Sequence, residues 1–184
     1  MNEASLLTLL SQVGAGALSP DEALARLRLL PVQELDGVRL DHHRRLRTGL
    51  PEAVLGASKT VPQLVRILRA MLAQQDVALA TRVAPEKAEA VCRELSGLSY
   101  HAEARILSGN GQYVIRIGGG LITIVTAGTS DIPVAEEARV TLSLFGHETR
   151  CVYDAGVAGI HRILAQADLL QESRVVIVIA GMEG

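Results

Sequence analysis

Two apolar segments in the second half of the chain constrain its fold more than any other feature. Residues 121–128 have the sequence LITIVTAG, and residues 174–181 have the sequence RVVIVIAG. Strands that are apolar at nearly every position are buried on both faces, which is typical of parallel sheets covered by helices. Helices are predicted over 131–145 and about 157–170, with a strand near 148–153 between them. The resulting β-α-β-α-β order predicts an α/β protein with the start of a doubly wound parallel sheet.

The residues before these segments predict a separate, small α/β domain. Ser19 and Glu22 have the spacing of a helix capping box. The glycine triplet at 118–120 marks a boundary, so residues 1–117 are expected to form one domain and residues 121–184 another. The elements predicted in the first domain are helices over 4–13, 20–30, 60–74 and 85–95, and strands over 37–41, 52–55, 77–81, 100–107 and 112–117, the last two joined by a turn at 108–111.

The composition excludes several functional classes. The formal net charge of the 184 residues is −2 and aromatic residues make up 2% of the chain, so the basic surface and stacking platforms of single-stranded nucleic-acid binders are both missing. No apolar run approaches the ~18 residues of a membrane span, and the N-terminus lacks the positive start of a signal peptide. The two cysteines, Cys92 and Cys151, form no CxxC motif, which indicates a cytoplasmic protein without a disulfide framework or a zinc site made of thiolates.

The turn after the first apolar strand is the best candidate for binding an anion. Gly128 permits a close backbone approach, and the hydroxyls of Thr129 and Ser130 can donate hydrogen bonds to phosphate oxygens. The free N–H groups at the start of the next helix also favour an anion. The segment TAGTSD matches neither the P-loop nor the GxGxxG fingerprint, so Mg-ATP or ordinary dinucleotide binding does not follow from it. A helix cap formed by Ser130 or Asp131 explains the same residues about equally well.

Other candidates follow the remaining strands of the predicted sheet. Glu183 lies between two glycines at a strand tip, where a carboxylate is placed for acid–base chemistry, although a solvated turn explains it more simply. The segment DAGVAGIHR (154–162) contains small residues that allow a ligand near the backbone. His161, within it, is more simply an interface histidine than a catalyst. Cys92 lies on an apolar helix stripe and Cys151 has no evident activating base, so neither is assigned as a nucleophile.

A basic cluster, DHHRRLRTG (41–49), stands out in the first domain. Adjacent histidines on an extended chain point to opposite sides, so His42 and His43 are not expected to form a metal site. Arginine side chains match phosphate geometry, and anion binding by Arg44 or Arg47 is slightly favoured over a solvated basic surface.

Five segments in one consistent order cover most of the chain: VRLDHHRRLRTGLPEAVLG, LATRVAPEKAEAV, TAGTSDIPVAEEA, YDAGVAGIHR and VIVIAGMEG. Together they resemble the LarB family of nickel-pincer nucleotide biosynthesis. The second domain also resembles, more distantly, the PurE family of carboxyaminoimidazole ribonucleotide mutases. The resemblance implies a small N-terminal α/β domain followed by the first half of a PurE-like, flavodoxin-like parallel sheet.

The resemblance to LarB implies an enzyme that is both a carboxylase and a hydrolase. It would use nicotinic acid adenine dinucleotide and carbon dioxide or bicarbonate, add a carboxylate to the pyridinium ring, and cleave the phosphoanhydride to release AMP, with Mg²⁺ as the expected helper. PurE-like domains form rings, commonly octamers, so a homo-oligomer is expected. The roles implied for this chain are phosphate and ribose binding by Gly128, Thr129, Ser130 and Asp131, removal of the ring proton by Glu183, and a grip on the dinucleotide by Arg44 and Arg47.

Two departures from the family patterns affect these expectations. In the LarB family, the cysteine whose thiolate adds to the pyridinium ring lies beyond the GMEG segment, so this chain is expected to be C-terminally truncated and inactive by itself. In the PurE family, the catalytic histidine belongs to a Ser-Ala-His-Arg motif, whereas His161 comes a few residues late, which disfavours the mutase reaction. A PurE-like mutase and a non-catalytic nucleotide-binding module are the alternative functions.

Overall fold

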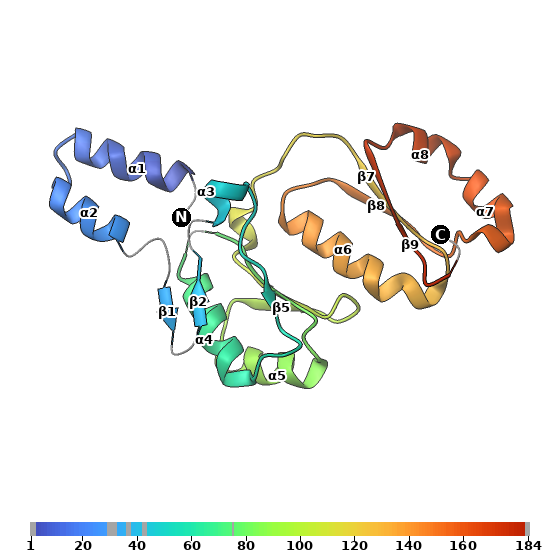
Figure 1. The fold of residues 1–184 in the computed structure, drawn as a ribbon, viewed down its shortest axis with the longest axis horizontal. Helices are drawn as coiled ribbons and strands as arrows, with labels where there is room; N and C mark the ends of the chain where they lie inside the picture. The colour runs from blue at the N-terminus through green and yellow to red at the C-terminus, as the bar shows by residue number, and fades with distance from the viewer. Residues whose placement is uncertain (1–2, 29–32, 36–37, 42–43, 75, 183–184) are drawn as a thin grey trace.

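A computed structural model describes residues 3–28, 33–35, 38–41, 44–74 and 76–182 of the chain (Figure 1). The chain begins with a helical hairpin, in which α1 (Glu3–Gly14) and α2 (Pro20–Arg28) pack around the buried side chains of Leu9 and Leu18. The Glu22 amide donates to the Ser19 hydroxyl at 3.2 Å, and the Ser19 amide donates to the Glu22 carboxylate at 3.0 Å. The predicted capping box and both predicted helices are therefore confirmed.

A two-stranded ribbon and a short helix follow. β1 (Gln33–Leu35) and β2 (Val38–Leu40) are antiparallel, which confirms the strand predicted over 37–41 and adds a partner that was not predicted. The basic residues of the cluster belong to α3 (Arg44–Thr48), a helix that was not predicted from the sequence. The Thr48 hydroxyl donates to the Arg44 carbonyl at 2.8 Å, and Gly49, with a φ of 76°, follows the last helical residue. His42 and His43 lie outside the described residues.

Residues 54–109, the four-stranded unit, form a sheet with the strand order β3-β4-β6-β5. β3 (Val54–Leu55) runs parallel to β4 (Ala78–Thr81), whereas β6 (Ile106–Gly109) is antiparallel to β4 and to β5 (Leu98–His101). Because side chains alternate along a strand, Ala78 and Ala80 face α4 (Val61–Leu72) and α5 (Pro85–Glu94), and Leu79 faces away from them. The predicted helices over 60–74 and 85–95 are confirmed.

The hairpin within this unit differs from its prediction. Strands were predicted over 100–107 and 112–117, but the strands are β5 and β6, and residues 111–113 form a 3₁₀ turn. The chain reverses before Ile106, with Arg105 at a φ of 51°, so Ser108 and Gly109 pair within β6 instead of turning. Asn110 ends β6, since its side-chain amide donates to the carbonyls of Leu72, Gln74 and Asp76 at 2.9–3.1 Å. Because these hydrogen bonds join residues that are far apart in the sequence, no local sequence pattern indicates them.

Residues 122–179, the three-stranded unit, confirm the predicted β-α-β-α-β order. β7 (Ile122–Thr126) lies between β8 (Thr149–Val152) and β9 (Val175–Ile179), and all three strands are parallel. α6 (Ile132–Leu144) connects β7 to β8. The helix predicted over 157–170 is broken into a 3₁₀ turn (Val157–Gly159), α7 (Ile160–Leu164) and α8 (Ala167–Glu172). In Figure 1, α6 and the α7–α8 pair lie on opposite sides of the sheet, as in doubly wound α/β proteins.

The last apolar segment is less buried than its sequence predicts. β9 pairs with β7 along one edge, and in the described part of the chain no strand pairs with its other edge. Val176 and Val178 consequently keep 42% and 56% of their side-chain surface exposed. Although β9 is apolar on both faces, it is therefore an edge strand among the described residues.

α6 packs between the two sheets. One side of the helix lies on β7 and β8. On another side, Val140 joins Leu79 and Ile106 of the four-stranded unit in a shared buried cluster, and Leu144 and Phe145 pack against it. The Arg82 guanidinium also bonds the Glu137 carboxylate across the junction at 3.2 Å. The two units therefore share one helix as a common layer (Figure 1).

The linker between the units is fixed at the turn that follows α6. The Ile117 amide donates to the Gly146 carbonyl at 2.8 Å. Gly146 has a φ of 90°, and a Cβ atom added there would lie 1.9 Å from the carbonyl oxygen of Ile115. Both the backbone angle and the contact with main-chain atoms require glycine at this position.

We expect Gly146→Ala to lower the free energy of unfolding by at least about 2 kcal/mol, because it combines an unfavourable φ with a clash against backbone that cannot rotate away. Gly118→Ala is the matched control, since a Cβ at that linker position meets nothing within 4 Å. Urea denaturation of both variants measures the difference. Equal stability of the two variants would contradict the packing described for the linker.

Candidate functional site

A cavity of about 500 Å³ opens at the carboxyl ends of the three parallel strands. Strand order reverses between β7 and β9, and ligands of open α/β sheets bind in the crevice at such a point. Loops that follow all three strands contribute to the wall. The lining residues are Ala127, Gly128, Ser130, Asp131, Gly156, Val157, Ala158, Arg162, Gly181 and Met182.

The turn after β7 forms one wall of this cavity. Thr129–Asp131 is a 3₁₀ turn that leads directly into α6. The Gly128 amide donates to the Asp131 carboxylate at 3.0 Å, so Asp131 holds the turn closed, in agreement with the capping interpretation of that residue. Ser130 is exposed and lines the cavity, as anion binding requires, whereas Thr129 is exposed and is not among the lining residues. Their ligand-binding roles stay predictions.

The loop after β8 approaches this turn closely. The Gly156 amide donates to the Ala127 carbonyl at 2.9 Å, and a Cβ at Gly156 would lie 2.7 Å from that same oxygen. The Asp154 amide donates at 3.0 Å to the hydroxyl of Thr126, a residue with no exposed surface. Small residues in DAGVAGIHR thus bring two loops together, and the cavity wall depends on that contact.

Arg162 brings a positive charge to the cavity. Its Nη1 atom lies 2.6 Å from the carboxylate of Asp154, and its Nε atom lies 2.6 Å from where a Cβ of Gly159 would stand. Arg162 is the one cation among the described residues that line the cavity. The sequence by itself indicates no role for Arg162, because only the fold brings this residue beside Asp154. His161 is exposed and lies outside the lining.

Two predicted groups of site residues are not brought to this cavity. Arg44 is exposed on α3, which in Figure 1 lies on the far side of the four-stranded unit from the carboxyl ends of the parallel strands. Arg47 belongs to the same helix, and its side chain lies outside what the structure describes. Glu183 also lies outside the described residues, directly after Met182 of the cavity wall. The roles of these three residues stay predictions.

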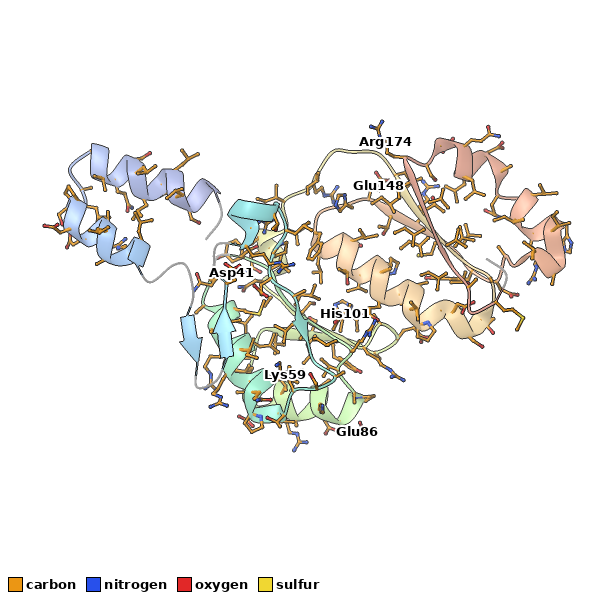
Figure 2. The ribbon with its side chains drawn as sticks, in the orientation of Figure 1. Asp41, Lys59, Glu86, His101, Glu148 and Arg174 are labelled. Atoms are coloured by element: carbon orange, nitrogen blue, oxygen red, sulfur yellow. The ribbon has the colours of Figure 1, made fainter. Side chains whose placement is uncertain are left out.

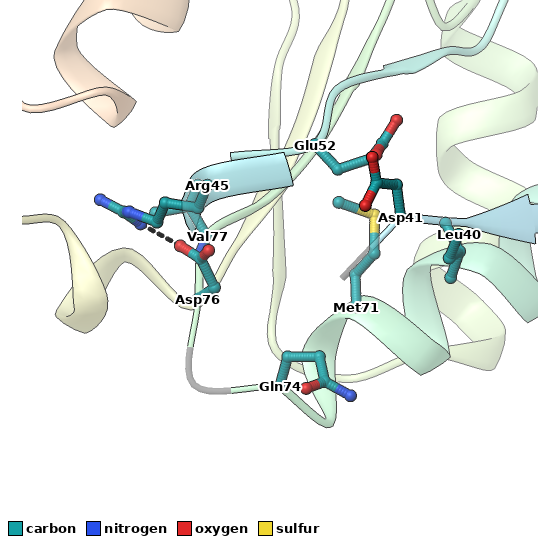
Figure 3. Close-up of a pocket in the computed structure, with 8 residues that line it drawn as sticks. All are labelled: Leu40, Asp41, Arg45, Glu52, Met71, Gln74, Asp76 and Val77. Atoms are coloured by element: carbon teal, nitrogen blue, oxygen red, sulfur yellow. Dashed lines mark hydrogen bonds and ion pairs between the residues drawn. The ribbon is translucent and has the colours of Figure 1, made fainter. Parts of the chain in front are cut away.

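A second, small cavity occupies the region of the basic cluster (Figure 3). It measures about 30 Å³, which is room for a water-sized molecule and not for a nucleotide. Arg45 of α3 forms an ion pair there with Asp76, and both side chains are largely buried. The Asp76 carboxylate also accepts from the Val77 amide at 2.8 Å. This part of the motif DHHRRLRTG therefore anchors α3 to the four-stranded unit.

A charged network connects α6 to the end of β8. The Glu136 carboxylate, 14% exposed, accepts two hydrogen bonds from the Arg139 guanidinium at 2.7 and 2.8 Å and one from the Tyr153 hydroxyl. The hydrogen bonds from Arg139 lower the pKa of Glu136, and burial raises the pKa of Tyr153. His101 lies beside α6 (Figure 2) and hydrogen-bonds Ser108 at 2.9 Å, and burial lowers its pKa.

The remaining reactive groups lie away from the cavity. Burial raises the pKa of Cys92, which packs against the core of the four-stranded unit, and Cys151 is half-buried in β8. Among the described residues, no three histidine, cysteine or acidic side chains come together as metal ligands. Within the same residues, no helix is both long and apolar enough to cross a membrane.

Fold and cavity define an α/β protein with an open cavity at the rim of a parallel sheet. Residues 32–111 match the sequence model of the LarB/PurE-like N-terminal domain. The chain is also 36% identical over 179 residues to a protein of Methanocaldococcus jannaschii described as uncharacterized, an alignment that covers 92% of this chain and 69% of the relative. The chain belongs to the LarB/PurE-like family.

We expect Glu136→Gln to destabilise the protein at neutral pH, with a difference from wild type that shrinks in acid. A carboxyl group whose pKa is lowered by folding contributes stability above its ordinary value of 4.5, and this contribution is lost as pH falls through the lower folded pKa. Urea unfolding at pH 7 and pH 3 measures both differences. Glu89→Gln, in an exposed pair with Arg93, is the control and should change little at either pH. A pH-independent effect of Glu136→Gln would refute the interpretation.

Proposed function

We propose that this protein adds a carboxylate to the pyridinium ring of nicotinic acid adenine dinucleotide and cleaves the phosphoanhydride to release AMP, within nickel-pincer nucleotide biosynthesis. Membership of the LarB/PurE-like family supports the reaction class. The cavity at the switch point of the parallel sheet is the observation that carries the proposal. Its volume of about 500 Å³ is within the usual range for sites that bind small molecules and cofactors.

The wall of the cavity suits one phosphate of the dinucleotide. The turn at 128–131 leads directly into the N-terminus of α6, where the helix dipole favours negative charge. The Ser130 hydroxyl adds a donor on the same wall, and the Arg162 guanidinium adds a positive charge from α7. We therefore assign phosphate binding to the turn Gly128–Asp131, with Asp131 fixing the turn through its bond to the Gly128 amide.

Mg²⁺ fits this site only in part. This ion commonly takes one or two carboxylates and completes its coordination with substrate phosphates and water. Asp131 would supply such a carboxylate, because one of its oxygens binds the Gly128 amide and the other faces Gly181. When bound, the ion would neutralise charge on the phosphoanhydride.

In the proposed reaction, one set of residues binds the substrate and another set makes and breaks bonds. The described residues supply the binding site. Covalent addition to the ring requires a thiolate, and the proposal assigns it to neither Cys92 nor Cys151, since neither lines the cavity. Glu183, which follows the wall residue Met182, is proposed as the base that removes the ring proton.

The exposed position of His161 counts against the PurE-like mutase reaction, because a catalytic histidine has to reach the bound ribotide and this side chain does not line the cavity.

A non-catalytic nucleotide-binding module predicts binding without turnover. The product of the complete reading frame, incubated with the dinucleotide and ¹⁴C-bicarbonate, should release AMP and place the label in a mononucleotide. Tight binding with no AMP would reject the enzyme in favour of the module, and absence of binding would reject both.

We expect Ser130→Ala to weaken binding of the dinucleotide by about tenfold or more, because a hydrogen bond to a charged group contributes about 1.5–3 kcal/mol. Titration calorimetry measures the affinity, and the unfolding temperature should stay close to wild type since Ser130 is exposed. Ser96→Ala, an exposed serine of the four-stranded unit, is the control. Unchanged affinity in Ser130→Ala would remove the turn from the binding site.

A further inference from the structure

Tyr153 occupies the position where the charged network of α6 meets the loop of the cavity. Its hydroxyl donates to Glu136, which the Arg139 guanidinium holds with two further hydrogen bonds. The next residue, Asp154, donates its amide to Thr126 and pairs its carboxylate with Arg162. The network and the ion pair in the cavity wall therefore involve consecutive residues.

Asp154 has a backbone conformation that needs support. Its φ of 55° lies in the left-handed region, which costs more than ordinary backbone for residues other than glycine, although aspartate tolerates it better than most. The loop is fixed on one side by β7, through the Thr126 hydroxyl and the Thr126 and Ala127 carbonyls, which accept the amides of Asp154, Ala155 and Gly156. On the other side, the side-chain contacts are the bond from Tyr153 to Glu136 of α6 and the ion pair of Asp154 with Arg162 of α7.

We propose that Tyr153 is a positioning residue whose bond to Glu136 holds Asp154 in its left-handed conformation and so presents Arg162 to the nucleotide cavity. The bond is well suited to this role, because Glu136 is itself immobilised by a bidentate arginine and lies on the helix packed between both sheets. The identity of the nucleotide rests on the proposed function, whereas the control of the loop by Tyr153 does not.

Tyr153→Phe removes the hydroxyl and keeps the ring. In the ligand-free protein, we expect amide hydrogen exchange at Asp154, Ala155 and Gly156 to accelerate by about fivefold or more, because the loop opens locally. The affinity for nicotinic acid adenine dinucleotide should fall by a similar factor, while the unfolding temperature changes little, since Tyr153 is 40% exposed. Glu136→Gln should reproduce the loop effect, and the double variant should be no worse than the more severe single variant.

Tyr100→Phe is the matched control, because this tyrosine hydroxyl also donates a single hydrogen bond, to the Val83 carbonyl at 3.0 Å, within the four-stranded unit. It should leave exchange at residues 154–156 unchanged. Equal exchange there in the two phenylalanine variants would overturn the positioning role. If the wild-type protein does not bind the dinucleotide, the proposed function fails, and the ligand-free exchange experiment still decides the role of Tyr153.

Discussion

The packing of α6 between two sheets is the interaction on which the rest of the structure depends. The helix covers β7 and β8 with one side and places Val140 against Leu79 and Ile106 of the four-stranded unit with another. A helix apolar on more than one side is stabilised only when both sides are covered. The four-stranded unit and the three-stranded unit therefore share buried surface, and a change in either one is transmitted to the same helix.

The same helix begins at the candidate site. Its first turn follows Gly128–Asp131, and one turn further along Glu136 reaches back to Tyr153 at the end of β8. The element that joins the two units thus also positions two of the loops that form the cavity. This arrangement gives the N-terminal part of the protein a physical connection to the candidate site, which none of its described residues lines.

The partners of the arginines show which of them stabilise the fold and which one faces the cavity. Arg45 is neutralised by Asp76 in a buried pair, and Arg139 is held by Glu136, so both stabilise the fold. Arg162 is half-exposed at the cavity, with Asp154 orienting it. All three are arginines in helices, and no local pattern distinguishes the one that faces the cavity from the two that do not.

The sequence alone determined the local and periodic features: the capping box of α2, the parallel β-α-β-α-β order, and the turn at 128–131 beside the sheet rim. These follow from short-range hydrogen bonds and from side-chain periodicity. Only the tertiary structure decided that the hairpin turns before Ile106 and that Arg162 rather than Arg44 reaches the cavity. Each of these depends on contacts between residues distant in sequence, such as Asn110 with the end of α4, whose energy is absent from any local window.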